Sequence, residues 1–332
     1  MPKGEYLQYG GQAIVEGVMM RSPKFFSIAC RAPNGEIVLT TEPLEKTWIG
    51  RQKWLKTPFL RGSWALLDAM TLGIKAMRFA SEIQIAPAYQ PEGEAKEKAQ
   101  AEAQSKKVQD AAIGITMVIS LALGLFLFNY IPNALAENTG RSLRLSGTGI
   151  NFITEIVKII FFLGYIALIG QMPDIKRVFQ FHGAEHKAIN VLEAEQELNM
   201  ENCRAQTRLH PRCGTSFAII VLILGIFVST FTPRYLFVGP DGNWLIAVSL
   251  RFLLEVFVLL PIISGIAYEL IRLAGKFRDT RLVNILFKPG LMSQYLTTRE
   301  PDDSQIEVSL AALDACIHAE ETGELRTANL AT

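Results

Sequence analysis

A run of histidine and glutamate near the middle of the chain has the spacing of a metal-binding motif. His182 and His186 are four residues apart, and Glu185 lies beside the second histidine. If this run is helical, both imidazoles lie on one face, because residues four apart are neighbours on a helix surface. The pattern H-x-x-E-H is that of inverted-motif zinc enzymes. It therefore predicts two metal ligands with an acid or base group next to them.

A second group of donors follows before the next apolar segment. His210 and Cys213 supply an imidazole and a thiol, with Pro211 and Arg212 between them, so that a tight turn can direct both toward one ion. Zinc is bound in proteins by nitrogen and sulfur donors of this kind. We therefore predict a divalent-metal site, with zinc as the expected ion. Its expected ligands are His182, His186, His210 and Cys213.

Three interpretations of this cluster stay open. In a catalytic site, three protein groups hold the metal, an open position binds water, and Glu185 takes the proton of that water. In a structural site, all four donors bind the metal and leave no room for a substrate. In the third interpretation no metal binds, and these side chains pair with neighbouring acids or backbone carbonyls. The number of donors favours the structural site, whereas the position of Glu185 favours catalysis.

Four long apolar segments predict a bundle of membrane-spanning helices. About 20 apolar residues in a helix cross a hydrocarbon core of about 30 Å. Four such segments in one chain favour a membrane protein over a soluble core. The predicted fold class is thus a mainly α-helical membrane protein with four transmembrane helices and a small β-containing N-terminal region. The expected spans are 111–131, 150–172, 215–232 and 244–271.

Two of the predicted spans contain charged residues. Glu155 and Lys158 are one turn apart, and so are Arg251 and Glu255, so that each pair can neutralise itself. Charges inside a membrane often mark a transport pathway. Mutual pairing against other helices costs less, and we favour that structural role here. Pro261 is expected to kink the last span.

The distribution of Lys and Arg predicts the orientation of the chain. Six of these residues lie between the second and third spans, against two between the first and second and only Arg234 in the last short loop. Cytoplasmic loops carry the excess of positive charge. Both termini and the His/Cys loop at 173–214 are therefore expected in the cytoplasm, with the lipid bilayer as the main partner. The net charge of +1 gives no indication of nucleic-acid binding.

Local sequence patterns predict the structure of the regions outside the bundle. Residues 1–56 read as a β-rich segment, in which Gly10, Gly11 and Gly17 form turns or permit close backbone contact. An amphipathic helix is expected over 57–90, either on the membrane surface or against the sheet, and then a charged linker over 91–110. The C-terminal segment 272–332 is expected to contain an amphipathic helix that begins with a Ser304 and Glu307 capping box and to end in a frayed tail.

Several motifs together resemble the YqhQ-type family of bacterial polytopic membrane proteins. They are Gly10-Gly11-Gln12-Ala13-Ile14-Val15-Glu16-Gly17-Val18-Met19-Met20-Arg21-Ser22-Pro23, His182-Gly183-Ala184-Glu185-His186-Lys187, Arg208-Leu209-His210-Pro211-Arg212-Cys213-Gly214-Thr215-Ser216-Phe217 and Leu296-Thr297-Thr298-Arg299-Glu300-Pro301-Asp302-Asp303. The resemblance extends from about Gly10 to Ala319. It implies a location in the bacterial inner membrane and a suspected metal site at the four donors named above. The family is described as predicted metal-dependent enzymes, and the resemblance indicates no substrate.

Three functional hypotheses follow, each from a different class. The first is a metal-dependent membrane enzyme, such as a hydrolase, with Glu185 as the base. The second is a metal-stabilised scaffold, or a partner of other membrane proteins, without catalysis. The third is a transporter, which rests only on Arg251 and Glu255.

Overall fold

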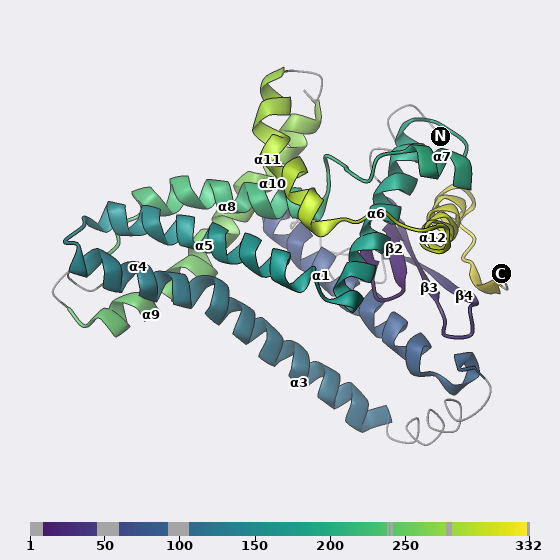
Figure 1. Cartoon of the computed structure of the whole chain (residues 1–332), viewed down its shortest axis with the longest axis horizontal. Helices are drawn as coiled ribbons and strands as arrows, with labels where there is room; N and C mark the ends of the chain where they lie inside the picture. Colours follow the sequence, from purple (N-terminus) through teal and green to yellow (C-terminus); the bar gives the residue numbers. More distant parts are fainter. Residues whose placement is uncertain are drawn as a thin grey trace.

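Four strands near the N-terminus and one near the C-terminus form an antiparallel sheet in the strand order β1-β2-β3-β4-β5, and Figure 1 labels its strands β2, β3 and β4. The computed structural model describes residues 9–44, 60–91, 106–237, 239, 242–276 and 281–330. The C-terminal strand pairs with β4, where the sequence suggested a frayed tail, so that the two ends of the chain share one sheet. The strands are β1 (Gly10–Ile14), β2 (Gly17–Arg21), β3 (Phe25–Arg31), β4 (Ile37–Pro43) and β5 (Thr327–Leu330).

The first two strands form a tight hairpin within the expected β-rich segment. Glu16 lies in the turn with a left-handed φ of 53°, a conformation that non-glycine residues rarely adopt. Its carboxylate forms two hydrogen bonds with the guanidinium of Arg177. A side chain at Gly17 would overlap the backbone of Ala29 on β3. This packing explains why glycine stands directly after the strained residue.

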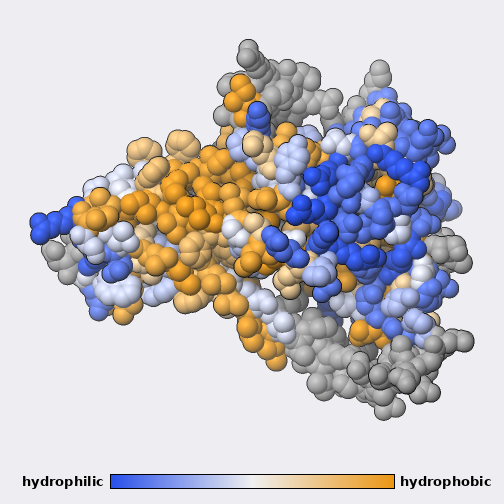
Figure 2. Space-filling view, viewed as in Figure 1, coloured by the Kyte–Doolittle hydropathy of each residue, from blue (hydrophilic) through white to orange (hydrophobic). Residues whose placement is uncertain are grey.

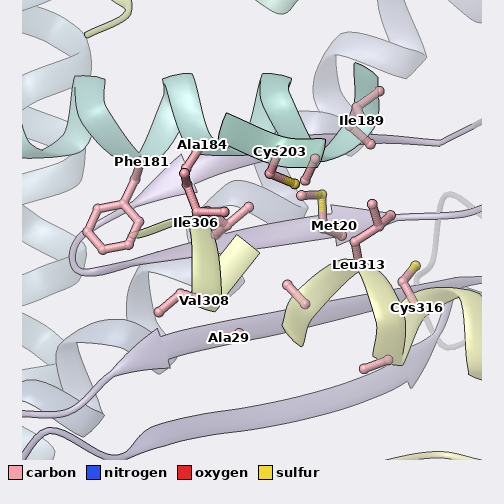
Figure 3. Packing of buried hydrophobic residues seen from close by; sticks show 14 of the residues in the cluster. Met20, Ala29, Phe181, Ala184, Ile189, Cys203, Ile306, Val308, Leu313 and Cys316 are labelled. Atoms are coloured by element: carbon pink, nitrogen blue, oxygen red, sulfur yellow. The ribbon is translucent and has the colours of Figure 1, made fainter. Parts of the chain in front are cut away.

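Two helices cover one face of this sheet. They are α6 (Pro173–Glu193) and α12 (Asp303–Thr322), and the short helix α7 (Met200–Ala205) packs beside them. Figure 3 shows Phe181 of α6, Leu313 of α12 and Met20 of β2 directed into a shared hydrophobic core. Asp302 and Gln305 form the capping box of α12, instead of the expected Ser304 and Glu307.

The other face of the sheet is covered by α1 (Leu60–Ile85), which is followed by the short helix η5 (Pro87–Tyr89). Leu72, Ala76 and Ala80 of α1 are buried against the sheet. Other large apolar residues of α1 face outward, and they include Leu67, Met70, Ile74 and Met77. The first half of the helix packs on the bundle, where Gly62 lies against α10 (Leu260–Lys276). The helix therefore joins the sheet-containing head to the bundle. The expected start at Thr57 lies outside the described residues.

Four helical segments among the described residues are long and apolar enough to cross a membrane. Figure 2 shows apolar residues gathered over these helices and hydrophilic residues over the head. Three of the segments match the expected spans to within three residues at each end, and the first continues past its expected end at 131 to Ser142. The four segments are Val118–Ser142, Gly147–Ile169, Gly214–Phe231 and Trp244–Ile271. Their elements are α3 (Lys106–Leu125), η7 (Phe126–Tyr130), α4 (Ile131–Ser142), α5 (Gly147–Ile169), α8 (Gly214–Phe231), α9 (Trp244–Leu254), η8 (Glu255–Leu259) and α10.

Two of the spans contain a π-helical segment, and a proline follows each segment at the same distance. The segment η7 ends two residues before Pro132, and η8 ends two residues before Pro261. Proline has no N–H group, and its ring clashes with the carbonyl four residues earlier. A π segment moves that carbonyl away and lets the helix continue. The expected disturbance at Pro261 is therefore a local π turn.

An additional helix, α11 (Arg281–Thr297), packs against α8 beside the His/Cys motif. Gly290 lies so close to Ser216 that an added side chain would approach its Cβ to 3.0 Å. This helix was not expected from the sequence. Pro289 lies inside it, and proline is unfavourable in the interior of a helix.

Gly183→Ala should destabilise the junction between α6 and the segment before α12. A methyl group at Gly183 would overlap the backbone carbonyl of Arg299, which a side-chain movement cannot relieve. Overpacking of this kind costs about 1–3 kcal/mol, and the better helix propensity of alanine offsets only part of it. Thermal unfolding of the purified protein measures the effect. Gly164→Ala is the control, because an added side chain meets nothing within 4 Å there. Equal melting temperatures for the two variants would contradict this contact.

Candidate metal site

Three side chains from two elements come together where the head meets the bundle. His182 and His186 lie one turn apart on α6, and Cys213 lies immediately before α8. One donor atom from each residue lies within 4.8 Å of the others. His186 and Cys213 are buried, and His182 is partly buried. A nitrogen, nitrogen and sulfur set at this spacing has the chemistry that zinc selects.

Backbone carbonyls orient both of these histidines. Nδ1 of His182 lies 2.9 Å from the carbonyl oxygen of Thr297, and Nδ1 of His186 lies 2.6 Å from that of Arg208. A carbonyl only accepts hydrogen bonds, so each Nδ1 must carry a proton, and Nε2 is the nitrogen that presents a lone pair in the neutral imidazole. Histidines that bind metals are commonly held in this way. Thr297 and Arg208 were not identified from the sequence as supporting residues, because both act through their backbone atoms.

The third donor lies at the start of a membrane-length helix. The sulfur of Cys213 lies 3.1 Å from Nε2 of His182 and accepts from the backbone amide of Thr215 at 3.4 Å. The hydroxyl of Thr215 is 3.2 Å from the same sulfur. The N-terminus of a helix favours a negative group, such as a metal-bound thiolate. The beginning of α8 is therefore suited to hold the sulfur ligand.

His210, the fourth expected ligand, is not part of this group of three. Its Nε2 bonds to the carboxylate of Glu193 at 2.9 Å, and Arg212 bonds to the same carboxylate. Its ring centroid lies 5.6 Å from that of His186. Gln294 of α11 holds its backbone with two hydrogen bonds, of 2.8 and 2.6 Å. The structure thus assembles three donors where the sequence suggested four, because an acid on α6 engages the remaining imidazole.

Glu185 lies beside the donors and under the N-terminal strand. Its Oε2 is 3.7 Å from Nε2 of His186, and the backbone amide of Gly11 donates a hydrogen bond to its carboxylate. A side chain at Gly11 would come within 2.8 Å of Cγ of Glu185. Gly11 therefore lets the backbone of β1 approach Glu185 closely, which is one of the two roles expected for this glycine.

Burial determines the protonation of the groups around the site. It raises the pKa of the Glu185 carboxyl, an effect that electrostatic interactions with the His182 and His210 imidazoles and the hydrogen bond from the Gly11 amide oppose. Burial lowers the pKa of His186, although a hydrogen bond with Cys213 opposes the shift. The pKa of His210 is also lowered by burial. His186 and His210 are thus kept neutral, which is the form of imidazole that binds a metal.

The fold and the cluster define a class of protein: a mainly helical chain whose described residues form four membrane-length helices, an antiparallel sheet and a His/Cys cluster at their junction. The chain belongs to the family described as "Protein of unknown function (DUF1385)", whose sequence profile matches residues 57–319. It is similar to "Uncharacterized protein YqhQ" of Bacillus subtilis (strain 168), with 36% identity over 319 residues that cover 95% of this chain and 94% of that protein. These matches confirm the resemblance to the YqhQ-type family. No solved structure matches the chain.

Proposed function

We propose that this protein is a metal-dependent hydrolase of the bacterial inner membrane, which cleaves an amide or ester bond at the cytoplasmic membrane surface. The observation that carries the proposal is the group of three donors, His182, His186 and Cys213, with Glu185 next to them. A catalytic zinc has three protein ligands and an open fourth position, whereas a structural zinc has four ligands. The engagement of His210 by Glu193 therefore favours the catalytic arrangement.

Each residue has a distinct part in this proposal. A zinc ion held by His182, His186 and Cys213 would lower the pKa of a water molecule and polarise the carbonyl of a substrate. Glu185 takes the proton of the attacking water and delivers it to the leaving group. Its raised pKa suits this exchange, because a general base works best when its pKa lies near the operating pH. The carbonyls of Thr297 and Arg208 keep both imidazoles aligned.

The membrane orientation belongs to the same proposal. The excess of Lys and Arg in the connection between α5 and α8 supports a cytoplasmic location for the head and for both termini. Cys213 begins α8, so the metal would lie at the cytoplasmic surface of the bilayer. A substrate with one part in the membrane and a bond exposed at its surface fits this position.

A metal-stabilised scaffold for membrane-protein partners is the second candidate, and burial of the donors favours it. His186 is 2% exposed and Cys213 is 7% exposed. One ligand pair belongs to α6 of the head and the remaining ligand to the start of α8, so a bound ion would fasten the head to the bundle. Ligation of this kind contributes directly to folding free energy.

Incorporation of oxygen from water distinguishes hydrolysis from a purely structural metal. Wild-type protein and Glu185→Gln are reconstituted in vesicles and incubated with a membrane extract in heavy-oxygen water. A hydrolase transfers the heavy oxygen into its product, which mass spectrometry detects without knowledge of the substrate. We expect labelled product with the wild type and a reduction of about 10²–10⁴-fold with Glu185→Gln, because a positioned base contributes that factor.

Metal content of the same samples separates the two candidates. Glu185 is not one of the three grouped donors, so Glu185→Gln should keep its metal. No label above background with metal-loaded wild-type protein, or equal label with both proteins, would contradict the hydrolase. The scaffold would then account for a retained metal.

A further inference from the structure

A cavity of about 600 Å³ lies inside the bundle, away from the His/Cys cluster. This volume lies in the range of small-molecule binding sites. Most of its wall is apolar, with contributions from α3, η7, α5, α8, η8 and α10. Leu121, Tyr165 and Leu260 at its edge are also exposed on the outside of the bundle. A molecule dissolved in the bilayer could therefore enter from the side.

Three charged side chains line this cavity near the middle of the membrane. Lys158 lies 11 residues from each end of α5, because that helix runs from Gly147 to Ile169. At about 1.5 Å per residue, this position is the centre of the span. Glu155 and Glu255 lie beside it. Charged groups at this depth are costly and usually functional.

The hydrogen bonds of this cluster leave one carboxylate oxygen of a cavity-lining residue without a donor among the described residues. Lys158 donates to Oε1 of Glu155 at 2.9 Å and to Oε2 of Glu255 at 2.5 Å. Arg251 donates to the other oxygen of Glu255 at 2.7 Å, so two cations balance two anions. No described residue donates to Oε2 of Glu155, which passes so close to Gly225 that a Cβ there would lie 3.0 Å away. Lys158 also keeps a third N–H.

The two π-helical segments lie at this cavity. Phe128 and Asn129 belong to η7, Glu255 and Leu259 belong to η8, and all four residues line the wall. Such segments occur often at functional sites, where they redirect side chains. Their presence on both sides of the same charged cluster is an observation independent of the cavity itself.

We infer that this cavity binds an amine-bearing zwitterionic lipid, such as phosphatidylethanolamine. The ammonium group donates to Oε2 of Glu155, and the phosphate accepts from the third N–H of Lys158. The balanced charge of the cluster matches a headgroup without net charge. The apolar walls receive part of an acyl chain. Binding of a lipid headgroup at this depth would be a function separate from the metal site. The inference rests on the membrane placement proposed above and is independent of hydrolysis.

Lipid retention by the full chain tests this inference. The protein is reconstituted with equal amounts of phosphatidylethanolamine, phosphatidylcholine and phosphatidylglycerol, released from the bilayer, and examined by native mass spectrometry. We expect about tenfold preferential retention of phosphatidylethanolamine over phosphatidylcholine, whose quaternary amine donates no hydrogen bond to Glu155. The preference should fall to near parity in Glu155→Gln, which keeps the side-chain volume and an acceptor for Lys158.

A matched pair of glycine variants tests the cavity itself. Gly124 lines the cavity, and Gly164 lies elsewhere on the bundle; an added Cβ meets nothing within 4 Å at either position. Gly124→Leu should reduce lipid retention at least tenfold, and Gly164→Leu should leave it unchanged. Equal retention of the three lipids by the wild type, or unchanged retention in Gly124→Leu, would overturn the inference. Metal content, measured on the same samples, reports separately on the proposed metal site.

Discussion

Purified wild-type protein should contain about one zinc ion per chain, and His186→Ala should lose it. His186 is one of only three grouped donors among the described residues, so its removal leaves two. Loss of a group that merely supports a ligand costs about 10–100-fold in metal affinity, and loss of a ligand should cost more. Mass spectrometry of the metal content after gel filtration measures this effect.

Two further histidine variants make the result specific. His318→Ala is the matched control, because this histidine lies on α12, where Nε2 is 3.6 Å from Glu324 of the same C-terminal region. It should keep its metal. His210→Ala should also keep most of the metal if three ligands suffice. A loss as large as that of His186→Ala would show that His210 completes a closed site, which favours the scaffold over the hydrolase. Wild-type protein with much less than one metal per chain would contradict both candidates.

Glu255→Leu should prevent the bundle from folding stably. Its carboxylate accepts from Arg251, from Lys158 and, at 2.9 Å, from Asn133. Asn133 in turn accepts from Arg234, which is paired with Glu137 at 2.9 Å, so the network extends through α4, α5 and η8. Removal of one partner from a buried ion pair costs about 3–5 kcal/mol, because the remaining charge has no compensation. The amount of monodisperse protein that survives heating in detergent is the measurement.

A double variant tests whether an unpaired buried charge causes this loss of stability. Arg251→Met combined with Glu255→Leu removes both charges, and Lys158 keeps Glu155 as its partner. We expect the double variant to be more stable than Glu255→Leu alone, since no unpaired arginine remains. Glu307→Leu serves as the control, because it breaks an ion pair with Arg31 in which the glutamate is exposed, and such pairs contribute about 0–1 kcal/mol. If Glu255→Leu melted like this control, the network would not be a source of stability.

The membrane-length helices could be predicted from the sequence, because hydrophobicity over a long run is a local property. The end of the first span was expected too early, for a related reason. The span continues past Pro132 to Ser142 and includes Asn133 and Glu137, which polar groups from other helices satisfy. Local hydropathy treats those residues as the end of a span, since it cannot include partners that lie far away in the chain. The expected internal pairing of Arg251 with Glu255 and of Glu155 with Lys158 is present, but the two pairs are joined through Lys158.

The candidate site was predictable only in part. The spacing of His182 and His186 placed them on one helical face, because the helix repeat is the same in every protein. The contribution of Gly11 could not be predicted, since a strand and a helix more than 170 positions apart meet there. The complete sheet of the head could not be predicted either, because its last strand, β5, comes from the other end of the chain.

By itself, the sequence determined which side chains carry donor atoms of the kind that metals select, which segments are apolar enough to cross a membrane, and to which family the chain belongs. Only the tertiary structure decided that Cys213 joins the two histidines of α6, while His210 pairs with Glu193. It also decided that charged residues of separate spans surround one cavity. The physical reason is that donor type and hydrophobicity are properties of residues and short segments, whereas the distance between residues of different helices depends on how those helices pack.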